Sequence, residues 1–357
     1  MSSSQDWSSQ VMRTSAGGTW SELSAYQKEC DAAYDDLKII SGDPGFSSDI
    51  PTVVCVARNE ESRLPHFLDH YAGLGVRRFH IIDNGSTDAT QSIGAAWSGA
   101  TVWYTESSYA RASFGQLWIG AVARRHGLGK WVLNVDCDEF LVYPGMEKHD
   151  LGQLCKWICG QGQRRLFAPQ LDMYPQFLKD ADLEALVGEI EGTRGLKAML
   201  ASASHFDRRL SGTVDNYKFD GVNAGVDVRG GVRHRISLAE NTKPHFCLTK
   251  YPLSLWDGST AYANAHFPWP FKLNPTKNFA MLLHFKIMSD FPERVEAAIA
   301  ENQHWSDSCE YRAYRRWMVA GASFYGPDVS EKYAGMDQLE RQGLISPIGW
   351  EEEAESG

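Results

Sequence analysis

The feature that most constrains this chain of 357 residues is an apolar run that leads directly into a cluster of acids. Residues 131–135 have the composition of a buried strand, and Asp136, Asp138 and Glu139 follow within four positions. Carboxylates this close repel one another unless a cation neutralises them. A divalent cation with oxygen ligands is the usual solution, and a nucleoside diphosphate can share it. The competing interpretation is an ordinary acidic turn after a core strand. The neighbouring motifs are needed to choose between a cation site and such a turn.

Three further strands of the same kind precede this one, and helical segments alternate with them. The predicted strands cover residues 52–57, 78–83, 101–105 and 131–135, and the predicted helices cover 61–74, 87–97 and 113–126. A strand, a helix and a further strand in sequence form a right-handed crossover between parallel strands. The alternation therefore predicts an α/β fold whose first half is a mostly parallel, Rossmann-like sheet.

Polar clusters follow three of these strands at the point where each strand ends. They are Arg58–Glu60, Asp83–Asp88 and Asp136–Glu139. In open parallel sheets, ligands bind beyond the carboxyl ends of the strands, which lie along one edge. Three clusters at one edge favour a ligand site over three unrelated turns. Local roles compete with this interpretation, because an acid early in a helix also suits the helix dipole.

Composition excludes some classes of function. A net charge of −10 argues against nucleic-acid binding, which needs clustered Lys and Arg. The seven cysteines form no CxxC pair, as expected of reduced thiols. The polar N-terminus is not a secretory signal, and no apolar run is long enough to span a bilayer. We expect a cytoplasmic protein and leave open a peripheral association with the inner face of the membrane.

The remaining chain is less regular. We expect disorder over residues 1–20, a helix over 21–40, strands over 165–171, 230–235, 250–253 and 281–286, a loop-rich stretch over 176–225, and helices over 291–304 and 310–320. The predicted organisation is an N-terminal extension (1–50), a nucleotide-binding half (51–145), an acceptor-binding half (146–290), C-terminal helices (291–345) and an acidic tail (346–357).

The assembled motifs resemble the nucleotide-sugar glycosyltransferases of family 2, in particular the bacterial branch with an Asp-x-Asp-Glu-Phe metal motif. The resemblance is carried by Val-Ala-Arg-Asn-Glu-Glu at 56–61, Ile-Asp-Asn-Gly-Ser-Thr-Asp at 82–88 and Val-Asp-Cys-Asp-Glu-Phe-Leu at 135–141. It implies a GT-A fold with a nucleotide-binding half and a mixed acceptor-binding half. It also implies inverting transfer of a sugar from a nucleoside diphosphate. One departure is Asn84, where many members carry a second Asp.

The resemblance also implies roles for individual residues. Mn²⁺ or Mg²⁺ would be held by Asp138 and His284, with Asp136 on the ribose or metal side. A buried core histidine is the alternative for His284. The nucleotide would contact Ala57, Arg58, Glu60, Asp83, Asp88 and Asp136.

Positive and aromatic residues later in the chain extend the expected site. Arg233, Arg235, Lys250 and Lys286 are candidate partners of the diphosphate. His266 lies among aromatic residues that suit a sugar-binding wall, although a structural aromatic cluster fits equally well. The alternative for the four cations is that they are solvated surface charges, which is the more frequent role of any one such residue.

Inverting transfer needs a base within hydrogen-bond reach of the acceptor hydroxyl. Asp172 is the first choice, because it is expected to end a strand and to be followed by Met173 and Tyr174. Asp257, Glu310 and His266 remain open.

The predicted function is metal-dependent transfer from a nucleotide sugar, most simply a UDP-sugar, to a glycan, a lipid-linked glycan or a small glycoside, as in polysaccharide biosynthesis. Two alternatives remain. A sugar-phosphate nucleotidyltransferase would need a Gly-rich loop after the first strand, where this chain has Arg58–Glu61. A non-catalytic nucleotide-sugar-binding protein is the other.

Overall fold

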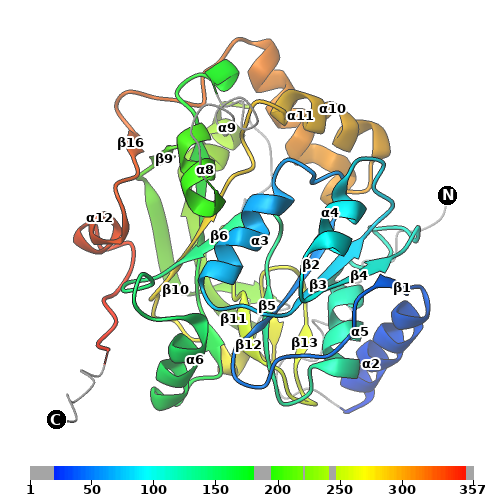
Figure 1. Ribbon diagram of the computed structural model, residues 1–357. Helices are drawn as coiled ribbons and strands as arrows, with labels where there is room; N and C mark the ends of the chain where they lie inside the picture. The colour runs from blue at the N-terminus through cyan, green and yellow to red at the C-terminus, as the bar shows by residue number, and fades with distance from the viewer. Residues whose placement is uncertain (1–19, 181–193, 220–221, 241–246, 351–357) are drawn as a thin grey trace.

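The computed structural model describes residues 20–180, 194–219, 222–240 and 247–350. Its larger sheet has seven strands in the order β1-β4-β3-β2-β5-β12-β7 (Figure 1). The four predicted strands are β2 (Thr52–Ala57), β3 (Phe79–Asp83), β4 (Ala100–Tyr104) and β5 (Trp131–Asn134). Each is parallel to its neighbour among the four, which confirms the predicted parallel α/β sheet. Three antiparallel pairings complete this sheet: β1 (Lys38–Ser41) pairs with β4, β12 (Leu253–Leu255) pairs with β5, and β7 (Arg165–Leu166) pairs with β12.

Alternate residues of β2 explain why helices cover both faces of this sheet. Val53 and Cys55 belong to the core that includes helix α3 (Leu64–Gly73), whereas Val54 belongs to the core on the other face. There α5 (Gln116–His126) packs against the N-terminal helix α2 (Trp20–Asp35). A strand buried on both faces has to be apolar at every position, which accounts for the continuous apolar run.

A second sheet has five strands in the order β16-β9-β8-β15-β6. The central part comprises β6 (Glu139–Val142), β15 (Met281–His284) and β8 (Gln170–Tyr174). In register, His284 is opposite Glu139 on β6 and opposite Asp172 on β8. Residues opposite one another on neighbouring strands project from the same face, so the register brings these three polar side chains together. The outer strands are β9 (His205–Asp207) and β16 (Ser330–Lys332).

The other elements surround the two sheets. The hairpin β10 (Leu210–Phe219) and β11 (Val222–Gly230) leads into α9 (Gly231–Ala239). Helices α10 (Phe291–Glu301) and α11 (Trp305–Val319) pack side by side at the top of Figure 1. The smaller elements are α4 (Thr90–Ala96), α6 (Leu151–Gly160), η1 (Leu178–Asp180), α8 (Gly195–Ser202), β13 (Ala261–Tyr262), β14 (Pro268–Trp269), η2 (Phe271–Leu273) and α12 (Met336–Arg341). None of the helices that the structure describes is long and apolar enough to cross a membrane.

Several expectations about local structure are wrong. Residues 38–40 form edge strand β1 instead of continuing the first helix, because they pair with β4. Residues 231–235 are helical instead of extended, and of 250–253 only Leu253 lies in a strand. The predicted strand over 165–171 is two strands in different sheets, β7 and β8. The expected disorder at the start of the chain and most of the acidic tail fall on residues outside the described ranges.

Two further corrections bear on the site. The stretch 176–225, expected to be loop-rich, contributes α8, β9, β10 and the start of β11. Helix α4 begins at Thr90, three residues after the predicted start at residue 87. The Ser86 hydroxyl accepts a hydrogen bond from the backbone of Asn59, which joins the loops that follow β2 and β3.

Candidate functional site

A cavity of about 300 Å³ opens at the carboxyl ends of the parallel strands. The sequence-predicted residues that line it are Ala57, Arg58, Glu60, Asp136, Asp138, His284 and Lys286. Its wall is completed by α10 and by the loops on either side of that helix. The three polar clusters thus meet at one edge, because parallel strands place their carboxyl ends together.

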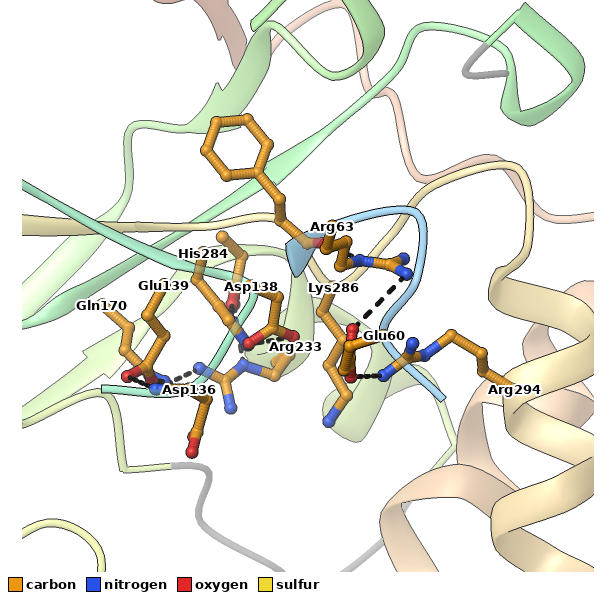
Figure 2. A network of polar contacts seen from close by, with 12 residues as sticks. Glu60, Arg63, Asp136, Asp138, Glu139, Gln170, Arg233, His284, Lys286 and Arg294 are labelled. Carbon is orange, nitrogen blue, oxygen red and sulfur yellow. Dashed lines mark hydrogen bonds and ion pairs between the residues drawn. The ribbon is translucent and has the colours of Figure 1, made fainter. Parts of the chain in front are cut away.

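Asp138 and His284 lie at the floor of the cavity, and Asp172 lies behind His284, outside the cavity lining (Figure 2 labels Asp138 and His284). Nε2 of His284 is 3.4 Å from Oδ2 of Asp138, and Nδ1 is 2.7 Å from Oδ1 of Asp172. Burial alone would lower the pKa of His284, but the two carboxylates raise it to about 9. Burial would raise the pKa of Asp138, yet His284 and the nearby arginines hold it far below its usual range. The imidazole is therefore fixed in orientation by one carboxylate and presents its other nitrogen to the second.

Asp172 does not end a strand as expected, because it lies in the middle of β8. Its side chain is only 3% exposed, and its Oδ2 accepts a hydrogen bond from Nε of Arg233 at 2.8 Å. Burial opposes ionisation, but Arg233 and His284 hold the pKa of Asp172 well below its usual range. Asp172 is not among the described residues that line the cavity. The geometry gives it the role of a support for His284 and leaves no free oxygen edge for an acceptor.

Arg233 reaches β8 because the backbone turns sharply before α9. Gly230 has φ 123°, and a Cβ there would lie 2.1 Å from the carbonyl oxygen of Arg209. Only glycine fits such a turn. The turn lets Arg233, in the first turn of α9, donate to Asp172 and also to Gln170 at 2.7 Å. Arg233 is thus a buried structural cation and does not face the cavity as a diphosphate partner.

A second buried network holds the acidic turn itself. Nζ of Lys250 is 2.8 Å from Oε1 of Glu139 and 3.3 Å from Oδ2 of Asp136. Gln170 donates to the same Glu139 carboxylate, which also accepts the backbone N–H of Asp136. Burial raises the pKa of Glu139, and Lys250 opposes this shift. Lys250 therefore neutralises the acids beneath the cavity, whereas the sequence suggested a contact with phosphate.

The opposite wall is built from α10, whose contribution the sequence did not reveal (Figure 2). Arg294 donates to Oε1 of Glu60 at 2.5 Å, and Arg63 forms two contacts of 2.6 Å with the carboxylate of Asp290. Burial raises the pKa of Glu60, against the effect of Arg294 and Arg63. The spacing of Asp290 and Arg294, one helical turn apart, is the sequence feature that indicates an ion pair at the start of this helix.

Two predicted nucleotide contacts have local partners in this structure. The Asp83 carboxylate accepts hydrogen bonds from the backbone of Ser86 and from Gln91, the latter at 2.7 Å. The Asp88 carboxylate accepts the backbone N–H groups of Thr90 and Glu61. Neither carboxylate is among the described groups that line the cavity. Their geometry matches the competing local roles in the turn and at the start of α4.

Arg235 and His266 lie away from the cavity lining as well. Arg235 is 3.4 Å from the Asp207 carboxylate and donates to the carbonyl oxygen of Phe324. His266 is hydrogen-bonded to the carbonyl oxygen of Thr249 at 2.7 Å. Burial, with Lys250 nearby, lowers the pKa of His266 to about 4. His266 does not line the cavity, and the neighbouring Phe267 belongs to a core cluster with β11, which matches the alternative of a structural aromatic cluster.

Asp257 and Glu310 are the remaining candidates for the catalytic base. Asp257 follows β12, which runs antiparallel to β5 and places Leu255 opposite Trp131. Asp257 therefore lies at the far edge of the sheet, with its carboxylate bound to Ser259 and Thr260. Glu310 lies 3.3 Å from the Lys286 ammonium and accepts a hydrogen bond from Tyr314. Neither candidate is part of the described cavity lining.

Comparison with known proteins adds a distant structural similarity and no family. No protein-family model matches the chain, and no curated protein matches it. Among solved structures, part of the fold is similar to a mannosyltransferase from Pyrobaculum calidifontis, PcManGT, solved in complex with GDP-Man and Mn²⁺. The match has a TM-score of 0.25 and 17% sequence identity, and it covers 49% of this chain and 48% of the other. The aligned part thus spans about half of either chain.

Proposed function

We propose that this protein is a metal-dependent, inverting glycosyltransferase of the GT-A type, similar to family 2, that uses a nucleotide sugar as its donor. A UDP-sugar is the donor proposed for the first test. The acceptor is a hydroxyl group of a glycan, a lipid-linked glycan or a small glycoside. The cavity, its charges and the position of the acidic motif at the carboxyl edge of the sheet support this function.

The observation that carries the proposal is that His284 lies between Asp138, at the cavity floor, and the buried Asp172 behind it. A histidine that binds a metal almost always gives its second ring N–H to a carboxylate or carbonyl, which fixes the ring. Here Asp172 is 2.7 Å from Nδ1, so Nε2 is the nitrogen left to face Asp138 at 3.4 Å. An imidazole and a carboxylate together suit Mn²⁺, and carboxylate oxygens suit Mg²⁺.

The donor set is small. Within the described residues, no group of three or more His, Cys, Asp and Glu side chains is arranged to hold a metal ion. Asp138 and His284 would therefore hold the cation, with Asp136 beside them, and the diphosphate would complete its coordination. When bound, the metal would neutralise the negative charge that develops on the leaving diphosphate.

The protein's own cations would act on the same leaving group. Lys286, Arg294 and Arg58 line the cavity, and each has a carboxylate partner nearby. A diphosphate offers oxygens to several such donors at once. We expect these side chains to orient the donor so that the bond between the sugar and the phosphate oxygen points into the cavity.

A binding and product assay tests this function. We would measure the melting temperature with UDP-glucose, UDP-N-acetylglucosamine and GDP-mannose, with and without MnCl₂, in the wild type and in Asp138→Asn. Asp257→Asn is the matched control, because it removes a carboxylate at the other edge of the sheet. A donor that stabilises only with Mn²⁺, and less in Asp138→Asn, supports the proposal.

Products distinguish this function from the alternatives. Release of a nucleoside diphosphate from the donor is expected. Pyrophosphate release from a nucleoside triphosphate and a sugar phosphate would replace this function with nucleotidyl transfer. Binding without any turnover in the presence of Mn²⁺ would favour the non-catalytic alternative.

A further inference from the structure

An aromatic wall forms part of the cavity lining. It consists of Tyr109, which precedes α5, His304, at the start of α11, and Tyr311, within α11. The His304 ring centroid is 4.5 Å from that of Tyr311 and 5.9 Å from that of Tyr109. Aromatic faces are suitable surfaces for the apolar face of a sugar ring. None of these three residues was singled out by the sequence.

The four carboxylates that line the cavity all have cationic partners close by. Asp138 is beside His284, Asp136 beside Lys250, Glu60 beside Arg294, and Glu301 beside Arg58 at 2.9 Å. The second oxygen of Glu60 has no hydrogen-bond partner, but it is sealed from solvent. A carboxylate tied to a cation is a weakened base, since its charged form is already stabilised.

The ring of His304 differs from these carboxylates. Within the ranges that the structure describes, no hydrogen bond or ion pair to either ring nitrogen is found, although the residue lines the cavity. The charged and titratable groups around it are Tyr109, Tyr311, Lys286, Glu310 and Arg294. Burial, followed by Lys286, lowers the pKa of His304 to about 4, against the effect of Glu310. The imidazole is therefore neutral at pH 7, with a lone pair available.

We propose that His304 is the general base of the transfer reaction and that the wall of Tyr109 and Tyr311 holds the acceptor beside it. This inference rests on the proposed function. In the reaction the acceptor oxygen forms a bond to the anomeric carbon as the bond from that carbon to the diphosphate oxygen breaks. The hydroxyl proton passes to the free ring nitrogen of His304, and the electron pair of the broken bond leaves with the nucleoside diphosphate.

Neighbouring contacts hold His304 in place. Gln303 accepts hydrogen bonds from the Ser108 hydroxyl at 2.8 Å and from the backbone of Ala110 at 3.4 Å. Asn302, with φ 49°, ends α10 in a left-handed turn. These contacts join the loop that carries Tyr109 to the loop that carries His304, so the wall is built as a unit.

Donor binding should change the basicity of His304 in a defined direction. Lys286 and Arg294 lower the pKa of the ring in the free protein. A diphosphate bound to these cations brings negative charge, which raises the pKa of the ring toward the working pH, where a base is most effective. The pH profile of kcat should therefore fall on the acid side at a higher pH than the profile of kcat/KM.

The test compares His304→Gln with two other variants. Glu301→Gln removes the cavity-lining carboxylate that is the alternative base. His149→Gln is the control, because the His149 ring stacks on Trp350 away from the cavity. Nucleoside diphosphate release is measured with Mn²⁺ and the best-binding donor of UDP-glucose, UDP-N-acetylglucosamine and GDP-mannose, with water as the acceptor. We expect His304→Gln to lower kcat by roughly 10²–10⁴-fold. Donor affinity and melting temperature should change little, and the acid limb of the pH profile should disappear.

The results that would contradict this role of His304 can be told apart from one another. The assignment is overturned if His304→Gln keeps activity within about threefold of wild type. It is also overturned if the acid limb of the wild-type pH profile persists in this variant. A loss of activity confined to Glu301→Gln transfers the role of base to Glu301. A purely structural role of His304 would lower kcat but leave the limb in place. Wild type that binds none of the donors overturns the proposed function and, with it, the role of His304.

Discussion

The substitution Asp172→Asn separates the role that the structure gives to Asp172 from the role of catalytic base. The carboxylate accepts from Nδ1 of His284 at 2.7 Å and from Nε of Arg233 at 2.8 Å. Asparagine has the same shape but only one side-chain oxygen, with an NH₂ group in place of the other. In either orientation of the amide, one of the two partners faces a donor instead of an acceptor.

The size of the effect follows from burial. Asp172 and Arg233 have side chains that are 3% and 8% exposed, and breaking such a buried pair costs about 3–5 kcal/mol of folding free energy. Loss of the partner that orients a ligating histidine weakens metal affinity by about 10–100-fold. This corresponds to about 1.4–2.8 kcal/mol of binding free energy. Both effects should appear in one variant.

The assays are calorimetric titration of Mn²⁺ in the presence of a nucleoside diphosphate, and urea unfolding. Asp257→Asn is the control, and it should leave the Mn²⁺ affinity unchanged. Unchanged Mn²⁺ affinity in Asp172→Asn, together with a large loss of kcat, would refute the supporting role and restore Asp172 as the base.

Three further predictions concern other charged groups. Lys250→Met should cost about 3–5 kcal/mol in urea unfolding, because it leaves the buried Glu139 carboxylate uncompensated; a second change, Glu139→Gln, should recover much of the loss. Lys286→Met should weaken nucleoside diphosphate binding at least about tenfold in titration calorimetry. The control is Lys277→Met, which should leave this affinity unchanged, because the Lys277 ammonium lies over the Phe279 ring, away from the cavity. Burial lowers the pKa of His70 to about 4, so the unfolded chain takes up this proton first as pH falls. Stability should thus decline between about pH 6.5 and pH 4, by up to about 3 kcal/mol, and His70→Gln should flatten this decline.

The sequence was most informative where periodicity is strict. The apolar run of β2 and the polar residues directly after it could be placed because a buried parallel strand needs both, and the carboxyl edge then follows from topology. The pairing of Asp138 with His284 was implied by the resemblance to family 2 and not by periodicity, and the two side chains lie 3.4 Å apart.

What the sequence could not reveal depends on register and on distant contacts. Asp172 was misplaced because residues 165–171 read as one strand, although the chain there passes from one sheet into the other. Lys250 lies 111 residues from Glu139 and has no local signature of its role. The aromatic wall of Tyr109, His304 and Tyr311 combines the loop before α5 with the start and the body of α11, so no spacing in the sequence predicts it.

The most direct test of the metal-dependent function is the coupling between Mn²⁺ and nucleotide binding. Titration calorimetry with UDP, or with the best-binding nucleotide of the donor panel, would be run with and without MnCl₂ in wild type and Asp138→Asn. We expect Mn²⁺ to tighten nucleotide binding at least about tenfold in wild type, a coupling of about 1.4 kcal/mol, and to have little effect in the variant. Equal nucleotide affinity with and without Mn²⁺ in the wild type would contradict the proposed metal site.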